Sequence, residues 1–230
     1  RPTTLLLSLL LVLLASPIVA QTHRLATFNI RWDNPNDVGN LWKDRATQVI
    51  QLIQFHQIGI VGTQEVLAHQ LTELNKGLGF SSIGVGRDDG KAKGEFSPIH
   101  YDPTRYKLED SGTFWLSPSP EVPSKGWDAA LNRICTWGKF TSLEGSGFYV
   151  FNVHYDHIGQ QAREESSKLV LSKIQEINRE VLPVVWMGDF NVAPENPAYQ
   201  VIFKKETWKD ARLVSKLPSY GPRGTFTAFE

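Results

Sequence analysis

Apolar and polar positions along the chain follow two periods, one typical of helices and one typical of strands. Residues 43–56, 68–78 and 161–180 have the composition and spacing of helices that bury one face. Short apolar runs between them predict strands, at 25–30, 58–62, 97–101, 105–116, 135–143, 148–154 and 184–190. Because strands outnumber helices, the pattern favours a layered α/β sandwich over a simple parallel βαβ fold.

The first twenty residues differ from the rest. Residues 5–14 are almost entirely Leu and Val, and 15–20 end in small residues before Gln21. This run is shorter than the roughly 20 apolar residues that span a bilayer, and its exit suits signal peptidase. We therefore expect a signal peptide over 1–20, a secreted domain over 21–230 and no stable membrane insertion after cleavage. A buried apolar helix and a retained anchor are the alternatives.

Charge and cysteine content narrow the possible partners. Without Arg1, the chain has 23 basic and 24 acidic residues, which argues against a broad nucleic-acid footprint. A small phosphate-bearing ligand held by one or two arginines remains compatible with this balance. The single cysteine, Cys135, has no intramolecular disulfide partner and lies in an apolar context, so we predict a packing role. We expect a monomer.

The last predicted strand ends in the run Gly188-Asp189-Phe190-Asn191. Side chains alternate along a strand, so Asp189 and Asn191 are predicted to lean toward the same side at its carboxyl end. Open α/β sheets place ligands at this end, and Mg²⁺ prefers carboxylate oxygens. The alternative is an Asx-type turn without a catalytic role.

Other predicted strands also end in polar groups. One strand delivers Asn29, another delivers Glu65, and a third delivers His154 and Asp156 on one face with His157 beside them. Each has an ordinary structural explanation: Asn29 as a turn residue, Glu65 at a helix start and His154 as a hydrogen-bonded core histidine. Their repetition at successive strand ends favours one shared site.

These motifs, in their order and spacing, resemble those of the endonuclease/exonuclease/phosphatase superfamily, in its secreted microbial and fungal branch. The motifs are Phe28-Asn29-Ile30-Arg31, Gln64-Glu65, Asn152-Val153-His154-Tyr155-Asp156-His157 and Gly188-Asp189-Phe190-Asn191. The likeness extends from Leu25 onward. It implies a four-layer α/β sandwich, with two mixed β-sheets flanked by helices, and a divalent-metal phosphoesterase site.

The resemblance also implies roles for the strand-end residues. Glu65, with Asn29 nearby, would hold Mg²⁺ or Mn²⁺, and Asp189 would orient or activate the attacking water. Asn191 and His154 would contact the phosphoryl oxygens, so we expect Asp189, Asn191 and His154 to form the catalytic set.

The roles expected of the residues around this set are less defined. Arg133 suits a phosphate clamp by its charge and fork geometry, and a surface ion pair is the alternative. Asp156 and His157 are expected to support the site. Glu95 precedes a predicted strand in the same family block, where it would meet substrate or remain a solvated loop carboxylate.

One family motif has no counterpart in the sequence. The resemblance implies a closing Asp-His pair near the carboxyl terminus, and His23, His56, His69 and His100 do not lie in such a context. Residues 224–229 form a strand-like run that resembles the segment before this motif. We therefore expect a chain truncated at the C-terminal end and impaired in catalysis.

The implied substrate is a phosphate ester. The activity that we expect first is that of a nuclease-like phosphodiesterase, of the 3′–5′ exonuclease or endonuclease type, acting on RNA or DNA. A phosphomonoesterase or a lipid or inositol-phosphate phosphatase comes second. A single-strand exonuclease needs only a short basic groove with aromatic stacking, and Trp32, Trp42, Trp115 and Trp127 are the candidate stacking residues.

Two further alternatives come from other classes of protein. The run from Asn152 to His157 is one residue away from the zinc motif of metallo-β-lactamase-like hydrolases, but Asn152 replaces the first histidine ligand. The other is a secreted binding protein that kept the fold and lost the chemistry.

Overall fold

The computed structural model describes residues 22–204, 207–221 and 224–226. The predicted signal segment, 1–20, lies outside the described residues. Of the strand-like run 224–229, residues 224–226 are not part of a strand, and the remainder also lies outside the described residues.

Eight strands form two mixed sheets of four. The first sheet contains β1 (Leu25–Asn29), β2 (Ile60–Gln64), β3 (Ser81–Ile83) and β4 (Ile99–Tyr101) in the order β1-β2-β4-β3. The second contains β5 (Tyr106–Trp115), β6 (Ile134–Ser142), β7 (Gly147–His154) and β8 (Val184–Asp189) in the order β5-β6-β7-β8. Only β1–β2 and β7–β8 pair in parallel among these described strands.

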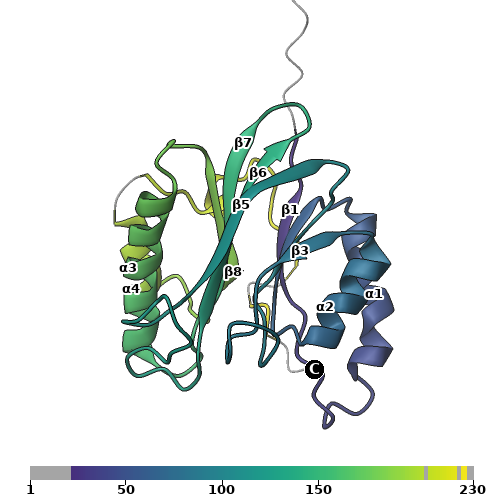
Figure 1. The fold of residues 1–230 in the computed structure, drawn as a ribbon, viewed down its shortest axis with the longest axis horizontal. Coiled ribbons are helices and arrows are strands. Elements are labelled where there is room, and N and C mark those ends of the chain that lie inside the picture. Colours follow the sequence, from purple (N-terminus) through teal and green to yellow (C-terminus); the bar gives the residue numbers. More distant parts are fainter. Residues whose placement is uncertain (1–21, 205–206, 222–223, 227–230) are drawn as a thin grey trace, which may run out of the picture.

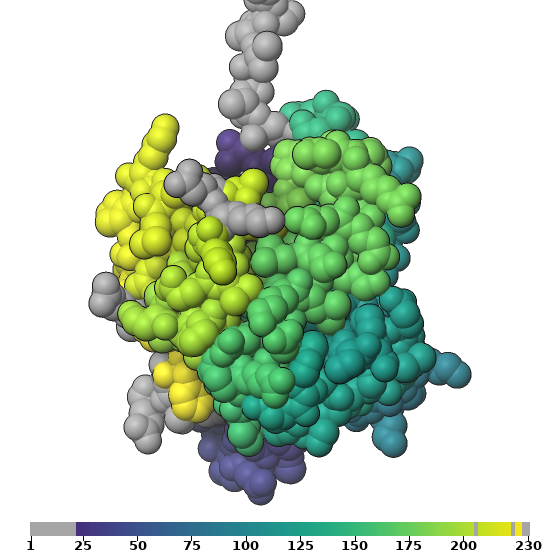
Figure 2. Space-filling model, turned by 90° about the vertical axis from the view of Figure 1, so that its left-hand side faces the viewer, coloured from purple at the N-terminus to yellow at the C-terminus, as the bar shows by residue number. Residues whose placement is uncertain are grey.

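Helices cover the outer face of each sheet, which gives four layers (Figure 1). Helices α1 (Trp42–Phe55) and α2 (Ala68–Leu78) lie on the first sheet. Helix α3 (Gln160–Ile177) lies on the second, beside α4 (Pro197–Phe203), and a short α5 (Ala211–Val214) follows. Figure 2 shows the later described segments in yellow alongside α3, and the Ser167 hydroxyl donates to the Ala198 carbonyl at 2.8 Å.

Apolar side chains form three clusters between these layers. One lies between the first sheet and its helices, around Trp42, Val61 and Leu74. A second lies between the second sheet and α3, and the third, which includes Ile99 and Phe140, lies between the sheets. Burying an apolar side chain of this size contributes about 1.5–3 kcal/mol, so these clusters explain why the layers associate. The predicted four-layer sandwich is confirmed.

The predicted elements match the observed ones within a few residues. The sequence missed β3, which is too short for a periodic signal, and also α4 and α5. The predicted helix at 161–180 begins one residue earlier and ends at Ile177, before the turn at 178–181. No helix of the described residues is long and apolar enough to cross a membrane.

The two parallel pairs place four strand ends at one end of the sandwich. Asn29 lies beside Gln64 in the β1–β2 register, and His154 lies beside Asp189 in the β7–β8 register. Because parallel strands end on the same side, each sheet contributes two neighbouring carboxyl ends to this place.

Candidate active site

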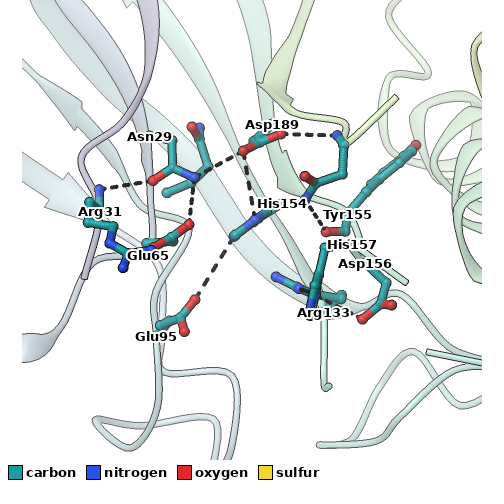
Figure 3. Close-up of polar contacts among 12 residues, drawn as sticks. Asn29, Arg31, Glu65, Glu95, Arg133, His154, Tyr155, Asp156, His157 and Asp189 are labelled. Atoms are coloured by element: carbon teal, nitrogen blue, oxygen red, sulfur yellow. Dashed lines mark hydrogen bonds and ion pairs between the residues drawn. The ribbon is translucent and has the colours of Figure 1, made fainter. Parts of the chain in front are cut away.

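The side chain of Asn29 joins the two sheets at this end of the sandwich. Its Nδ2 donates to Glu65 Oε1 and to Asp189 Oδ2, both at 2.9 Å (Figure 3). Asn29 Oδ1 accepts from the Arg31 backbone N–H at 2.9 Å, which fixes the orientation of the amide. The structure therefore brings together three residues that the sequence placed in one site.

Backbone strain is concentrated around these residues. Glu65 has φ 61°, Arg31 has φ 60° and Asn191 has φ 49°, all in the left-handed region that non-glycine residues rarely adopt. The backbone N–H of Trp32 donates to Glu65 Oε2 at 3.2 Å and holds that carboxylate. Each such conformation costs of order 1–3 kcal/mol and is typical of functional sites.

Asn191 does not occupy the position that strand alternation predicts. Strand β8 ends at Asp189, and the Asn191 backbone N–H then donates to Asp189 Oδ1 at 3.0 Å. This is the Asx-type turn of the alternative interpretation, so a turn and a candidate site coexist here. The exposed Asn191 turns its Nδ2 to the Tyr155 carbonyl at 3.0 Å. The prediction of a shared strand face is wrong because the strand has already ended.

His154 lies between two carboxylates. Its Nε2 is 3.9 Å from Asp189 Oδ2, and its Nδ1 is 4.0 Å from Glu95 Oε2 (Figure 3). Both distances exceed a hydrogen bond, so the two ring nitrogens face the carboxylates without bonding to them. Burial, and then the guanidinium groups of Arg133 and Arg87, hold the pKa of His154 well below its usual value. The imidazole is therefore neutral at pH 7.

Glu95 belongs to this group and has more definite surroundings than the sequence indicated. Arg87 Nη1 and Nη2 donate to its carboxylate at 2.8 and 2.9 Å, and the side chain is 18% exposed. Burial raises the pKa of Glu95 against the opposing effect of Arg87. A solvated loop carboxylate is therefore the wrong interpretation. The segment around Glu95 has no periodic pattern, so its approach to His154 was not predictable.

Asp156 turns away from His154 and anchors the neighbouring segment, 129–133. Its carboxylate accepts from the Ala130, Leu131, Ile158 and Gly159 backbone N–H groups at 2.8–3.3 Å. Burial opposes ionisation of this carboxyl, but these N–H groups hold its pKa below the usual range. The expectation that Asp156 shares a face with His154 is therefore wrong, because β7 ends at His154.

Arg133 is buried rather than part of a surface ion pair. Its Nε lies 3.3 Å from Asp156 Oδ2, and its Nη2 lies 2.9 Å from His157 Nδ1. Its Nη1 is buried and has no hydrogen-bond partner among the described residues. Asp156 and the exposed His157 thus hold the guanidinium next to His154, and the phosphate-clamp role of Arg133 stays a prediction.

The carboxylate oxygens around Asn29 are suitable ligands for a magnesium ion. Its amide N–H₂ occupies the place between the carboxylates of Glu65 and Asp189, a place that also favours a cation. No group of three or more His, Cys, Asp or Glu that could hold a metal occurs in the described part of the chain. Mg²⁺ requires no such group, because one or two carboxylates, several waters and a substrate phosphate complete its octahedron.

The four candidate tryptophans divide into two that are buried and two that are half-buried. Trp42 Nε1 donates to Glu73 and Trp115 Nε1 donates to the Arg87 carbonyl, both at 2.7 Å, and both side chains are buried. They are core residues, whereas Trp32 and Trp127 are half-buried. Cys135 is fully buried and burial raises the pKa of its thiol, as its predicted packing role requires.

The chain matches a known protein family. A model of the endonuclease/exonuclease/phosphatase family matches residues 26–229, and the chain belongs to this family. Members of the family are hydrolases that act on phosphoester bonds.

Two solved structures and one curated protein are similar to this chain. An endonuclease/exonuclease/phosphatase from Bacteroides vulgatus is 46% identical, with a TM-score of 0.82 over 84% of this chain and 76% of that chain. A mannosyl-6-phosphatase from Bacteroides thetaiotaomicron is 44% identical, with a TM-score of 0.79 over 80% of this chain and 70% of that chain. An uncharacterized protein of Acanthamoeba polyphaga mimivirus is 27% identical in a 168-residue alignment that covers 65% of this chain and 59% of the viral protein.

Proposed function

We propose that this chain is a divalent-metal-dependent phosphoester hydrolase that uses Mg²⁺ or Mn²⁺. The observation that carries the proposal is the pair of carboxylates, Glu65 and Asp189, that Asn29 holds together beside the buried His154. The carboxylate of Glu65 and the amide oxygen of Asn29 would hold the metal, which would supply charge stabilisation for the phosphoryl oxygens.

The residues of the chain divide the remaining work. Asp189 accepts a proton from a water that attacks phosphorus, because Asn29 and the Asn191 backbone N–H fix both of its oxygens. His154 donates an N–H to a phosphoryl oxygen, which a neutral imidazole does from one ring nitrogen. The P–O bond to the leaving group breaks, and the departing oxygen takes a proton from water. Asn191, which follows Asp189 in the same turn, contacts a phosphoryl oxygen.

For the substrate we favour a phosphomonoester, with a sugar phosphate as the first choice. The 44% identical structure is described as a mannosyl-6-phosphatase. The formal net charge of zero supports a small ligand over a long polyanion. The sequence alone placed a nuclease-like phosphodiesterase first. That second candidate retains one favourable observation, because half-buried Trp32 and Trp127 are compatible with stacking on bases.

A substrate panel separates these candidates. Phosphate or nucleotide release is measured with Mg²⁺ on mannose 6-phosphate, an inositol phosphate, a short RNA and a short DNA, each with an EDTA control. We expect EDTA-sensitive phosphate release from the sugar phosphate. Turnover of RNA or DNA alone would replace the monoester with the second candidate. No EDTA-sensitive turnover of any substrate would contradict the proposal and leave the binding-protein alternative.

The proposal includes secretion, which the apolar run at 5–14 supports. N-terminal sequencing of protein recovered from culture medium tests it. We expect the mature chain to begin at Gln21, and retention of residues 1–20 in a cell-associated protein would contradict secretion.

A further inference from the structure

A buried pair of side-chain amides joins the two sheets behind the candidate active site. Gln64 is the last residue of β2 and is 1% exposed, and Asn152, in β7, is fully buried. Gln64 Nε2 donates to Asn152 Oδ1 at 2.7 Å. Asn152 Nδ2 in turn donates to the carbonyls of Thr63 and Pro98, both at 2.9 Å. One side chain of the second sheet is thus hydrogen-bonded to Gln64 and Thr63 of the first sheet and to Pro98, which directly precedes β4.

The close approach of the strands shows that this contact is specific. A Cβ at Gly62 would lie 2.7 Å from Asn152 Cγ and Oδ1, so only glycine leaves room for the amide. Packed sheets are commonly about 10 Å apart with apolar side chains between them. Buried amides are costly unless their hydrogen bonds are made, and bonds of fixed direction allow one relative position of the sheets.

The pair is also adjacent to the reacting groups along the chain. Glu65 follows Gln64 directly, and His154 is two residues beyond Asn152, on the same face of β7. A change in the spacing of Gln64 and Asn152 therefore changes the spacing of Glu65 and His154. Asn29 also spans the sheets, but its amide lies in the site itself, where substrate and water compete for it.

We infer that Gln64 and Asn152 are positioning residues, which set the distance between the metal-holding side of the site and His154. The inference rests on the proposed function in one respect, because it takes Glu65 as a metal ligand. Neither amide touches substrate. Their effect is to keep the phosphoryl group within reach of both sides throughout the reaction.

The test uses Mn²⁺ as a paramagnetic probe. Mn²⁺ is titrated into the full 230-residue chain, and the relaxation of the His154 ring protons is measured by NMR. This relaxation depends on the inverse sixth power of the metal–proton distance, so it reports spacing without any turnover. Gln64→Met, Asn152→Leu and the double variant are compared with the wild type. The kcat and KM for mannose 6-phosphate and the melting temperature are measured in parallel.

Ser167→Ala is the matched control. Ser167 is fully buried in α3, where its hydroxyl contacts the Ala198 carbonyl at 2.8 Å and the Tyr155 hydroxyl at 3.2 Å. The substitution therefore removes buried hydrogen bonds on the other face of the second sheet. We expect a lower melting temperature, with an unchanged relaxation at His154 and an unchanged kcat.

For Asn152→Leu we expect a changed relaxation at His154 and a kcat lower by about 10²-fold, the effect of a displacement near 1 Å, with KM changed much less. Gln64→Met keeps the length of the side chain but loses the hydrogen bonds of Nε2 to Asn152 Oδ1, Thr27 Oγ1 and the Gly62 carbonyl. We expect a fall in kcat of about tenfold. This variant alone decides the test if Asn152→Leu does not fold. The double variant should be no worse than Asn152→Leu, because both act through one contact.

Two results separate this inference from the proposed function. Folded variants with an unchanged relaxation at His154 and a kcat within twofold of the wild type would overturn the positioning role. A wild type that hydrolyses no phosphoester, but whose His154 relaxation changes in the variants, would contradict the proposed function and support the positioning role.

Discussion

His100 and His154 are both buried histidines with a lowered pKa, but their hydrogen bonding differs. His100 lies in β4, with Nε2 2.9 Å from Thr63 Oγ1 and Nδ1 2.7 Å from Asn75 Oδ1. Burial lowers its pKa to about 3. Both ring nitrogens are used, so His100 ties β4 to β2 and α2 and has no capacity for a ligand.

His154 is also buried, at 7% exposure against 0% for His100, but its environment differs. Within the described residues, neither of its ring nitrogens makes a hydrogen bond, and each faces a carboxylate at about 4 Å. The ring nitrogens of His154 are therefore left for a ligand or water, whereas those of His100 are not. The comparison shows that partners, rather than burial, distinguish a histidine that stabilises the fold from one that acts in a site.

The strongest way to break the comparison is to replace His154. His154→Leu should lower kcat on the phosphomonoester by about 10²–10³-fold, because the N–H group that stabilises the phosphoryl oxygen is removed. The melting temperature should change little, since no intramolecular hydrogen bond is lost. Steady-state kinetics and thermal unfolding check both parts. A stable variant with the wild-type rate would show that His154 is a core residue without a role in catalysis.

The reciprocal replacement is His100→Leu. It leaves Thr63 and Asn75 without their buried partner and should lower the free energy of unfolding by about 2–3 kcal/mol. The rate per folded molecule should stay within twofold. Urea unfolding and active-site titration separate the two effects. Equal losses of stability and of rate per folded molecule would show that His100 and His154 do not have separate structural and catalytic roles.

The pH dependence of stability sharpens the role of His100. Its folded pKa of about 3 lies below the ordinary value of 6.5, so the unfolded chain binds a proton between these values and the folded chain does not. The resulting stability is fully present above pH 6.5 and is lost as the pH falls toward 3, at up to about 1.4 kcal/mol per pH unit. Urea unfolding at several pH values should show this slope in the wild type and a smaller slope in His100→Leu. Parallel slopes would contradict the assignment.

The smallest expected effect concerns Glu95. Glu95→Gln removes the charge that faces His154 Nδ1 and keeps the shape of the side chain. Because the carboxylate is 4.0 Å away and already paired with Arg87, we expect a fall in kcat of about threefold to tenfold. Asp33→Asn, in the exposed pair with His69, is a control that should leave kcat unchanged. A loss of 10³-fold would place Glu95 among the reacting groups.

Strand periodicity and motif order predicted most of this site, and local backbone geometry limited the rest. Parallel strand ends explain why Asn29, Glu65, His154 and Asp189 meet. The turn of Asn191 was not predictable in detail, because its positive φ depends on the contact with Asp189. The approach of Glu95 and the buried pairing of Arg133 with Asp156 depend on non-periodic segments that only the folded chain brings together.

Metal-dependent phosphate release by the wild type and by Glu65→Gln tests the central claim most directly. Release from mannose 6-phosphate is followed with Mg²⁺, with EDTA, and with EDTA followed by excess Mg²⁺. We predict that the wild type loses activity in EDTA and regains it with Mg²⁺, while Glu65→Gln is folded and inactive under all three conditions. Release that persists in EDTA, or that Glu65→Gln retains at the wild-type rate, would contradict a metal-dependent site built on Glu65 and Asn29.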